Sequence, residues 1–223
     1  MCSTLAEEKY SLAGGVQFSW EQHAFLREKV EELGKKADLR RAPELSISKH
    51  ERFASVNVFQ KRISLGENLL SLWQQGKFSD KDIEATIAHE VGHLMDFRRD
   101  SDSSNFRNLL IESLWFSFGI VPIVTYVLLP SVTWLFVSIL VALGWGLSLP
   151  WIVRRVEVRI EFEADRKAAM FLVEPQQLAD ALVRIGSLGK PPKTLGVTAK
   201  MSFLAGTLTH PSFKERICYL QNL

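Results

Sequence analysis

The spacing of apolar residues near the start of the chain predicts a helix. From Trp20 to Leu33, apolar side chains recur every three or four positions and would form one stripe along such a helix. Ser19 is of a type that caps helices, and Gln22 follows it three positions later, as in a capping box. The pattern therefore indicates a packing helix over this segment.

Three short segments after this helix alternate apolar and polar residues, as half-buried strands do. They cover residues 45–48, 53–59 and 62–65, and Gly66 closes the last of them. We expect these segments to form a small antiparallel sheet, followed by a short helix over residues 67–75.

A long stretch without charged side chains follows in the second half of the chain. From residue 113 to residue 153, 41 consecutive residues include no Asp, Glu, Lys or Arg. A bilayer crossing takes about 20 apolar residues, so this stretch with its flanks is long enough for two crossings. Pro130 and Ser131 near its middle favour a turn. We therefore expect a transmembrane hairpin with helices near 110–129 and 132–153.

The positions of basic residues predict how such a hairpin is oriented. Its tip has no basic residue, whereas its two flanks carry Arg98, Arg99, Arg107, Arg154, Arg155, Arg159 and Arg166. Because basic residues gather on the cytoplasmic side, we expect both flanks and both termini to be cytoplasmic. The competing interpretation is a buried helical pair inside a soluble domain, whose helices would ordinarily have polar outer faces.

Outside the uncharged stretch, the composition is that of a folded, soluble body. The 27 Lys and Arg residues nearly balance the 25 Asp and Glu residues, so no overall basic field argues for a nucleic-acid partner. Two cysteines are too few for a disulfide scaffold. The composition also excludes a disordered or a collagenous chain.

The clearest chemical motif is the run His89-Glu90-Val91-Gly92-His93, in a segment with helical periodicity that Ser79 can cap. Two histidines four positions apart lie on one side of a helix, so both imidazoles can bind one zinc ion. Glu90 is placed to address a water on that ion. Catalytic zinc takes a third protein ligand, so the motif requires a partner elsewhere in the chain.

Acidic residues in a later helical segment supply candidates for the third ligand. Glu161 and Asp165 are four positions apart and share a helix face, so one can bind zinc while the other holds a zinc-bound imidazole. Glu163 points about 160° away from this pair and is the weaker candidate. Without the histidine pair, a solvated acidic helix face would be the preferred interpretation.

The sequence resembles the integral-membrane zinc metallopeptidases of the HtpX and CAAX prenyl protease type, members of the gluzincin group. The resemblance rests on HEVGH at 89–93, EFEAD at 161–165 and the apolar segment between them. Further support comes from SVNVF at 55–59 and from THPSFKERI at 209–217. Together these motifs cover most of the chain from about residue 26 onward.

The resemblance also implies roles for individual residues. It makes Glu161 the third ligand of one zinc ion per chain, beside His89 and His93, and Asp165 the hydrogen-bond partner that orients a ligand. It makes Glu90 the catalytic base and places His210 and Arg216 near the substrate, with His210 assisting at the oxyanion and Asn57 binding substrate on an edge strand. A simple helix-start role for His210, which precedes Pro211, stays open.

The implied fold class is α+β. We expect a mainly helical, gluzincin-type metallopeptidase domain with a small antiparallel sheet, interrupted by the transmembrane hairpin. Residues 1–108 would form the first half of the peptidase domain, 109–153 the hairpin, and 154–223 the helical half with the third ligand. Two crossings return the chain to the same side of the bilayer, as a shared zinc site requires.

These features predict a membrane-embedded zinc metalloendopeptidase of a bacterial or archaeal cell membrane, with its active site facing the cytoplasm. Its partners would be the lipid bilayer and membrane-associated or misfolded polypeptides, bound along the sheet edge near Val56 to Phe59. One alternative is a non-catalytic membrane adaptor or sensor that retains a zinc site. A second alternative, a protease that processes prenylated peptides, shares every motif.

Overall fold

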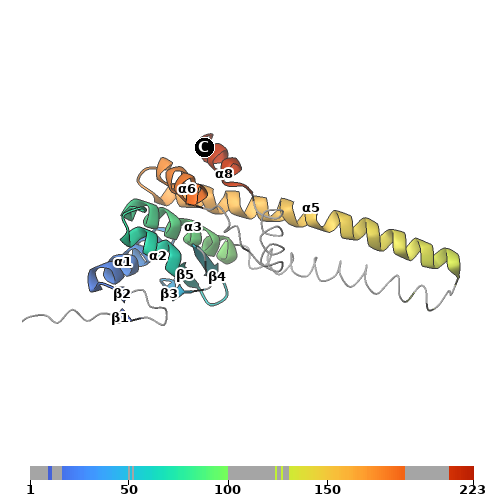
Figure 1. Ribbon diagram of the computed structural model, residues 1–223, viewed down its shortest axis with the longest axis horizontal. Helices are drawn as coiled ribbons and strands as arrows, with labels where there is room; N and C mark the ends of the chain where they lie inside the picture. The colour runs from blue at the N-terminus through green and yellow to red at the C-terminus, as the bar shows by residue number, and fades with distance from the viewer. Residues whose placement is uncertain are drawn as a thin grey trace, which may run out of the picture. The chain divides into compact units, whose positions relative to one another are not determined.

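The computed structural model describes residues 10–11, 17–49, 51, 53–99, 124, 127, 131–188 and 211–223. In chain order, the described elements are two short strands, a helix, three strands and then further helices (Figure 1). The predicted α+β class with mainly helical content is confirmed for this part of the chain.

Helix α1 (Trp20–Lys36) follows a minimal antiparallel pair, β1 (Tyr10–Ser11) and β2 (Gln17–Phe18). The predicted capping box is present, because the Ser19 hydroxyl accepts the Gln22 N–H at 3.2 Å and the Gln22 side chain accepts the Ser19 N–H at 3.3 Å. The apolar stripe of the helix is buried, as its spacing predicts.

The second sheet has three strands in the order β3-β5-β4, with β3 at Glu44–Ser48, β4 at Ala54–Asn57 and β5 at Arg62–Gly66. Strand β4 runs antiparallel to β5, but β3 runs parallel to it. The central strand β5 buries Ile63 and Leu65 completely. The sheet is therefore mixed.

The prediction of an entirely antiparallel sheet was wrong for the β3–β5 pair. Strands β3 and β4 run in opposite directions but lie on either side of β5, so a short loop joins them past the end of β5. The alternating piece predicted within 53–59 is strand β4, which ends at Asn57, where a turn begins. In that turn Lys61 has a φ of 52°, in the left-handed region.

The next two helices, α2 and α3, contribute buried residues to the main hydrophobic cluster. Helix α2 (Glu67–Gln74) ends near its predicted limit, and α3 (Asp80–Arg99) carries the histidine motif. Ser79 and Asp82 form a reciprocal cap at the start of α3, since each side chain accepts the other residue's backbone N–H. The buried face of α3 includes Ile83, Ile87, Val91 and Leu94, which join the main hydrophobic cluster.

The later helices are α5 (Val132–Phe171), α6 (Gln176–Leu188) and α8 (Phe213–Leu220). The first predicted crossing, near 110–129, lies outside the described residues except for Val124 and Val127. Within the described part of the chain, no helix has both the length and the apolar character required to span a bilayer. The transmembrane hairpin stays a prediction.

The chain divides into two compact units. The first comprises Met1–Asp96, Ile160–Lys193 and Ser212–Leu223, and the second comprises Phe97–Arg159 with Thr194–Pro211. Both halves of the candidate metal site, on α3 and on α5, fall within the first unit. The first unit is thus assembled from three separate stretches of sequence.

Candidate metal centre

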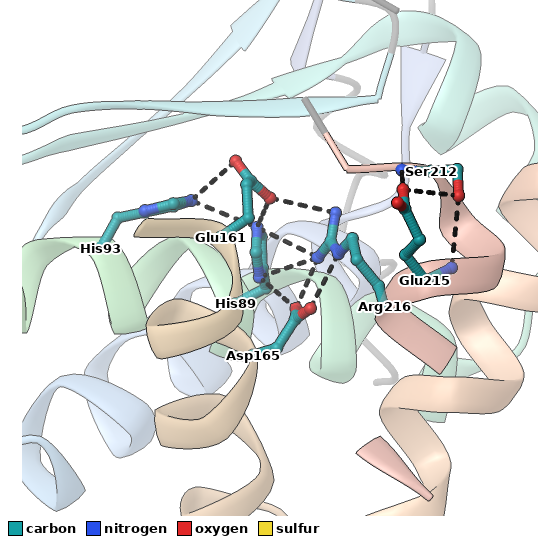
Figure 2. Close-up of polar contacts among 7 residues, drawn as sticks. All are labelled: His89, His93, Glu161, Asp165, Ser212, Glu215 and Arg216. Carbon is teal, nitrogen blue, oxygen red and sulfur yellow. Dashed lines mark hydrogen bonds and ion pairs between the residues drawn. The ribbon is translucent and has the colours of Figure 1, made fainter. Parts of the chain in front are cut away.

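Helix α3 presents the two imidazoles of the motif toward one point. The Nε2 atoms of His89 and His93 lie 3.2 Å apart, and the two rings meet edge to face (Figure 2). Two nitrogens bound to one tetrahedral zinc ion at about 2.0–2.1 Å would lie roughly 3.3 Å apart. The pair is therefore spaced as two ligands of a single ion would be.

Glu161 on α5 completes a triad of possible ligands. One of its carboxylate oxygens lies 3.4 Å from His89 Nε2, and the other lies 3.7 Å from His93 Nε2. One ligand atom from each of the three residues falls within 4.8 Å of the other two. Two imidazole nitrogens and a carboxylate oxygen form a donor set that zinc accepts, so the residues fit that metal.

Gly92, in the middle of the motif, allows helices α3 and α5 to pack closely against each other. A Cβ atom on Gly92 would lie only 2.6 Å from the backbone oxygen of Ala164 on α5. No side chain larger than hydrogen fits there unless a helix backbone moves. The middle of the motif therefore acts as a contact surface that brings α5, and with it Glu161, toward the histidines.

Asp165, one helical turn after Glu161, contacts the second ring nitrogen of His89, Nδ1. Its Oδ1 lies 2.9 Å from His89 Nδ1, and the Asp165 side chain is fully buried. With its Nδ1 proton donated to this carboxylate, His89 has Nε2 as the atom that can bind a metal once Nε2 gives up its own proton, on the side of His93 and Glu161. The geometry thus separates the two acids, which helix spacing alone left equivalent.

Comparison with known proteins identifies the family of this chain. The model of peptidase family M48 matches residues 21–223, nearly the whole chain. The chain belongs to peptidase family M48. It is also 26% identical over 223 residues to a protease HtpX homolog of Chlorobium phaeovibrioides, covering 91% of this chain and 72% of the relative. A protease HtpX homolog of Chlorobium luteolum is 26% identical over 243 residues, covering 100% of this chain and 79% of that protein.

Membership of this family confirms the predicted resemblance to HtpX-type metallopeptidases. A peptidase acts on polypeptides, so the expected substrate class is supported at that level.

Two acids of this M48 peptidase differ in their affinity for a proton. Burial raises the pKa of Glu90 to about 7, and the Glu161 charge adds to this, while His89 and Arg216 oppose it. Burial would also raise the pKa of Glu161, but hydrogen bonding to His89 and the neighbouring positive charges hold it well below its usual range. Glu161 is therefore suited to remain a carboxylate, whereas Glu90 can exchange a proton near neutral pH.

The two imidazoles also differ. Burial and the charge of His89 lower the pKa of His93 to about 3, so this ring stays neutral. Burial and Arg216 act in the same direction on His89, but hydrogen bonds to Asp165 and Glu161 outweigh them and raise its pKa to about 9.

Arg216 on α8 lies deeper in this centre than the sequence suggested. It was expected to face the substrate, yet its side chain is buried and contacts both Asp165 and Glu161 (Figure 2). No local pattern indicates this role, because Arg216 lies 51 residues beyond Asp165. The contact is recognisable only from the tertiary structure.

The remaining predicted site residues lie elsewhere or outside the described residues. Asn57 is exposed at the end of β4, where its side-chain oxygen accepts the Gln60 N–H at 3.0 Å. Glu163, the weaker acidic candidate, pairs with Arg166 at 2.8 Å. His210 lies outside the described residues. The substrate-related roles of Asn57 and His210 stay predictions.

Proposed function

We propose that this M48 peptidase is a zinc metalloendopeptidase that cleaves membrane-associated or misfolded polypeptides. His89, His93 and Glu161 would hold one zinc ion per chain, and Asp165 would orient His89. The observation that carries the proposal is the convergence of three ligand atoms from two helices on one point. Three protein ligands leave a fourth position for a reactant, as catalytic zinc sites require.

Glu90 is the proposed general base. When bound, zinc would lower the pKa of a water molecule toward 7 and polarise the scissile carbonyl. Glu90 can take a proton from the attacking water and deliver it to the leaving amine, because its pKa of about 7 suits both steps. Its carboxylate need not form a covalent bond to the substrate at any stage.

The sheet offers a place for an extended substrate. Among the described residues, β4 pairs with β5 on one side only, so its other edge has no strand partner. A peptide segment that added to this edge would be held by main-chain hydrogen bonds. We propose that Asn57 at the end of this edge contributes to substrate binding, and that His210 assists at the oxyanion.

We propose further that the uncharged stretch anchors the enzyme in the bilayer with the active site on the cytoplasmic side. The first part of α5 carries exposed apolar side chains, including Val132, Phe136, Leu140 and Leu143. Arg155 lies over the ring of Trp151, with 3.9 Å between the guanidinium carbon and the ring centroid. Aromatic and basic residues together are typical of a membrane–water interface. An enzyme anchored in this way would act on substrates at or in the membrane.

The test of the proposed activity is a comparison of Glu90→Gln with the wild type. The variant should retain zinc at one ion per chain but lose about 100-fold or more of its cleavage rate on an unfolded model protein, because it lacks the base. Glu163→Gln is the matched control, since Glu163 lies on α5 in a partly exposed pair with Arg166. It should cleave at the wild-type rate.

The same experiment separates the alternatives. A wild type that binds zinc but cleaves nothing would support the adaptor, provided that Glu90→Gln also leaves the cellular phenotype unchanged. A strong preference for a peptide with a lipidated cysteine over the unmodified peptide would support prenylated-peptide processing.

A further inference from the structure

The last described helix begins with a cap that fixes the position of one arginine. The Ser212 hydroxyl accepts the Glu215 N–H at 3.2 Å, and the Glu215 carboxylate accepts the Ser212 N–H at 2.7 Å (Figure 2). This box orients the first turn of α8, and the next residue is Arg216. Stacking of Tyr219 on Phe162 of α5, with centroids 4.6 Å apart, holds the same helix against α5.

The Arg216 guanidinium contacts two acids of the metal centre through all three of its nitrogens. Its Nε and Nη2 atoms contact the two oxygens of Asp165 at 2.8 and 2.5 Å, and its Nη1 atom lies 3.1 Å from Glu161 Oε2. Each of its three nitrogens therefore has a carboxylate partner.

The charges explain why such a group is needed. Glu161 and Asp165 are one turn apart on α5 and both are largely or wholly withdrawn from water, so two carboxylates would repel one another strongly there. Arg216 neutralises one of these charges. Its planar fork also sets the direction of both carboxyl groups.

We infer that Arg216 is a positioning residue of the metal centre, which keeps Asp165 on His89 and directs Glu161 toward the two imidazoles. The inference rests on the zinc site proposed above and replaces the substrate-binding role expected for Arg216. Through this residue, α8 becomes a third helical contributor to a site whose ligands come from α3 and α5. Lysine cannot substitute, because one ammonium group does not reproduce the two-sided contact.

The inference is tested by measuring zinc affinity, by competition with a chelator, in full-length wild type and Arg216→Lys. Partners behind metal ligands typically contribute about 10- to 100-fold in affinity, so the variant should bind zinc weaker by that factor. With Co²⁺ in place of zinc, its visible absorption bands should shift as the ligand geometry relaxes. Arg166→Lys, which alters an arginine paired on the surface with Glu163, should change neither readout.

Kinetics at saturating zinc distinguish positioning from substrate binding. A positioning role predicts that kcat falls while KM stays within about twofold of the wild type. An unchanged zinc affinity and cobalt spectrum together with a raised KM would overturn the inference and restore the substrate role.

A second variant covers the case in which Arg216→Lys does not fold. Ser212→Ala combined with Glu215→Ala removes the cap but keeps every side chain of the centre, and it should weaken zinc binding by several-fold. Wild-type zinc affinity in this variant would overturn the inference. If the wild type itself binds no zinc, the proposed function fails as well, so the two failures are distinguishable.

Discussion

Gly92 determines how closely α3 and α5 can approach at the metal centre. The added Cβ atom would meet backbone atoms of Ala164, which cannot rotate away as a flexible side chain could. Any larger residue must therefore displace a helix that carries a ligand. The smallest residue of the motif thus sets a distance on which the chemistry depends.

Gly92→Ala should accordingly lower the free energy of unfolding by about 1–3 kcal/mol, the usual cost of overpacking. It should also weaken zinc binding, because Glu161 moves with α5. Chemical denaturation and chelator competition measure the two effects. Gly144→Ala is the matched control, since a Cβ there meets nothing within 4 Å, and its stability should stay near that of the wild type. Equal stability of the two variants would refute the close-contact explanation.

At the residue scale, the sequence predicted part of the centre. The pairing of His89 with His93 follows from helix geometry alone, because residues four apart share a face. The same rule left Glu161 and Asp165 equivalent, the resemblance made Glu161 the ligand, and in the structure Glu161 is the acid that faces both Nε2 atoms. The resemblance places Arg216 near the substrate, but its contact with Asp165, 51 residues earlier, leaves no periodic trace in the sequence.

At the element scale, a charged junction joins α1 to α3. Lys29 Nζ lies 3.0 Å from a Glu32 carboxylate oxygen on its own helix and 3.3 Å from one of Glu84 on α3. The hydrogen bond to Glu32 is the main cause of a raised pKa for Lys29. Hydrogen bonds from Lys36 and then Lys29 lower the pKa of Glu32.

Lys29→Gln should reduce the free energy of unfolding at pH 7 by about 0.5–1 kcal/mol, a modest value for a partly exposed pair. The pKa of Glu32 is depressed in the folded state, so its contribution is present above its unfolded pKa and is lost as the pH falls through the folded value. The difference from wild type should therefore shrink below about pH 4.

Denaturation of both proteins at pH 7 and pH 3 measures this change, with Lys35→Gln, an exposed position on the same helix, as the control. An equal loss at both pH values would assign the effect to packing of the lysine stem instead.

The elements themselves were predicted with mixed success. The capped helix α1 and the histidine helix α3 follow from local signals, because their caps and apolar stripes lie within a few residues of each other. No local signal predicts the direction of β3 relative to β5. Alternation of apolar and polar residues predicts a strand, but not which strand it pairs with or in which direction. Strand β4 ends at Asn57, so Val58 and Phe59 lie in the turn although their strand propensity is high.

At the scale of the whole molecule, the chain leaves the first compact unit after Asp96 and rejoins it at Ile160. The proposed bilayer anchor lies in the intervening segment, so both ends of that segment must be on one side of the membrane. An odd number of crossings would place α3 and the ligand-bearing end of α5 in different compartments. This topological requirement agrees with the two crossings that the length of the uncharged stretch predicts.

Labelling of single cysteines tests this topology. With Cys2→Ser, the exposed Cys218 should react with a membrane-impermeant maleimide only after the cells are permeabilised. With both native cysteines replaced and Ser131→Cys introduced at the predicted hairpin tip, the label should react with intact cells. Labelling of Cys218 in intact cells would contradict a cytoplasmic active site. If positions 131 and 218 were both labelled in intact cells, or both only after permeabilisation, they would lie on the same side of the membrane and the hairpin would be contradicted.

The contribution of α8 to the centre also orders events during biosynthesis. Arg216 is translated 127 residues after His89. The two imidazoles are therefore synthesised well before the guanidinium group that positions Glu161 and Asp165. A nascent chain must therefore be extended through its last described helix before its zinc affinity reaches the final value. Late capture of the ion would keep a newly made protease inert while it is still attached to the ribosome, close to other unfolded chains.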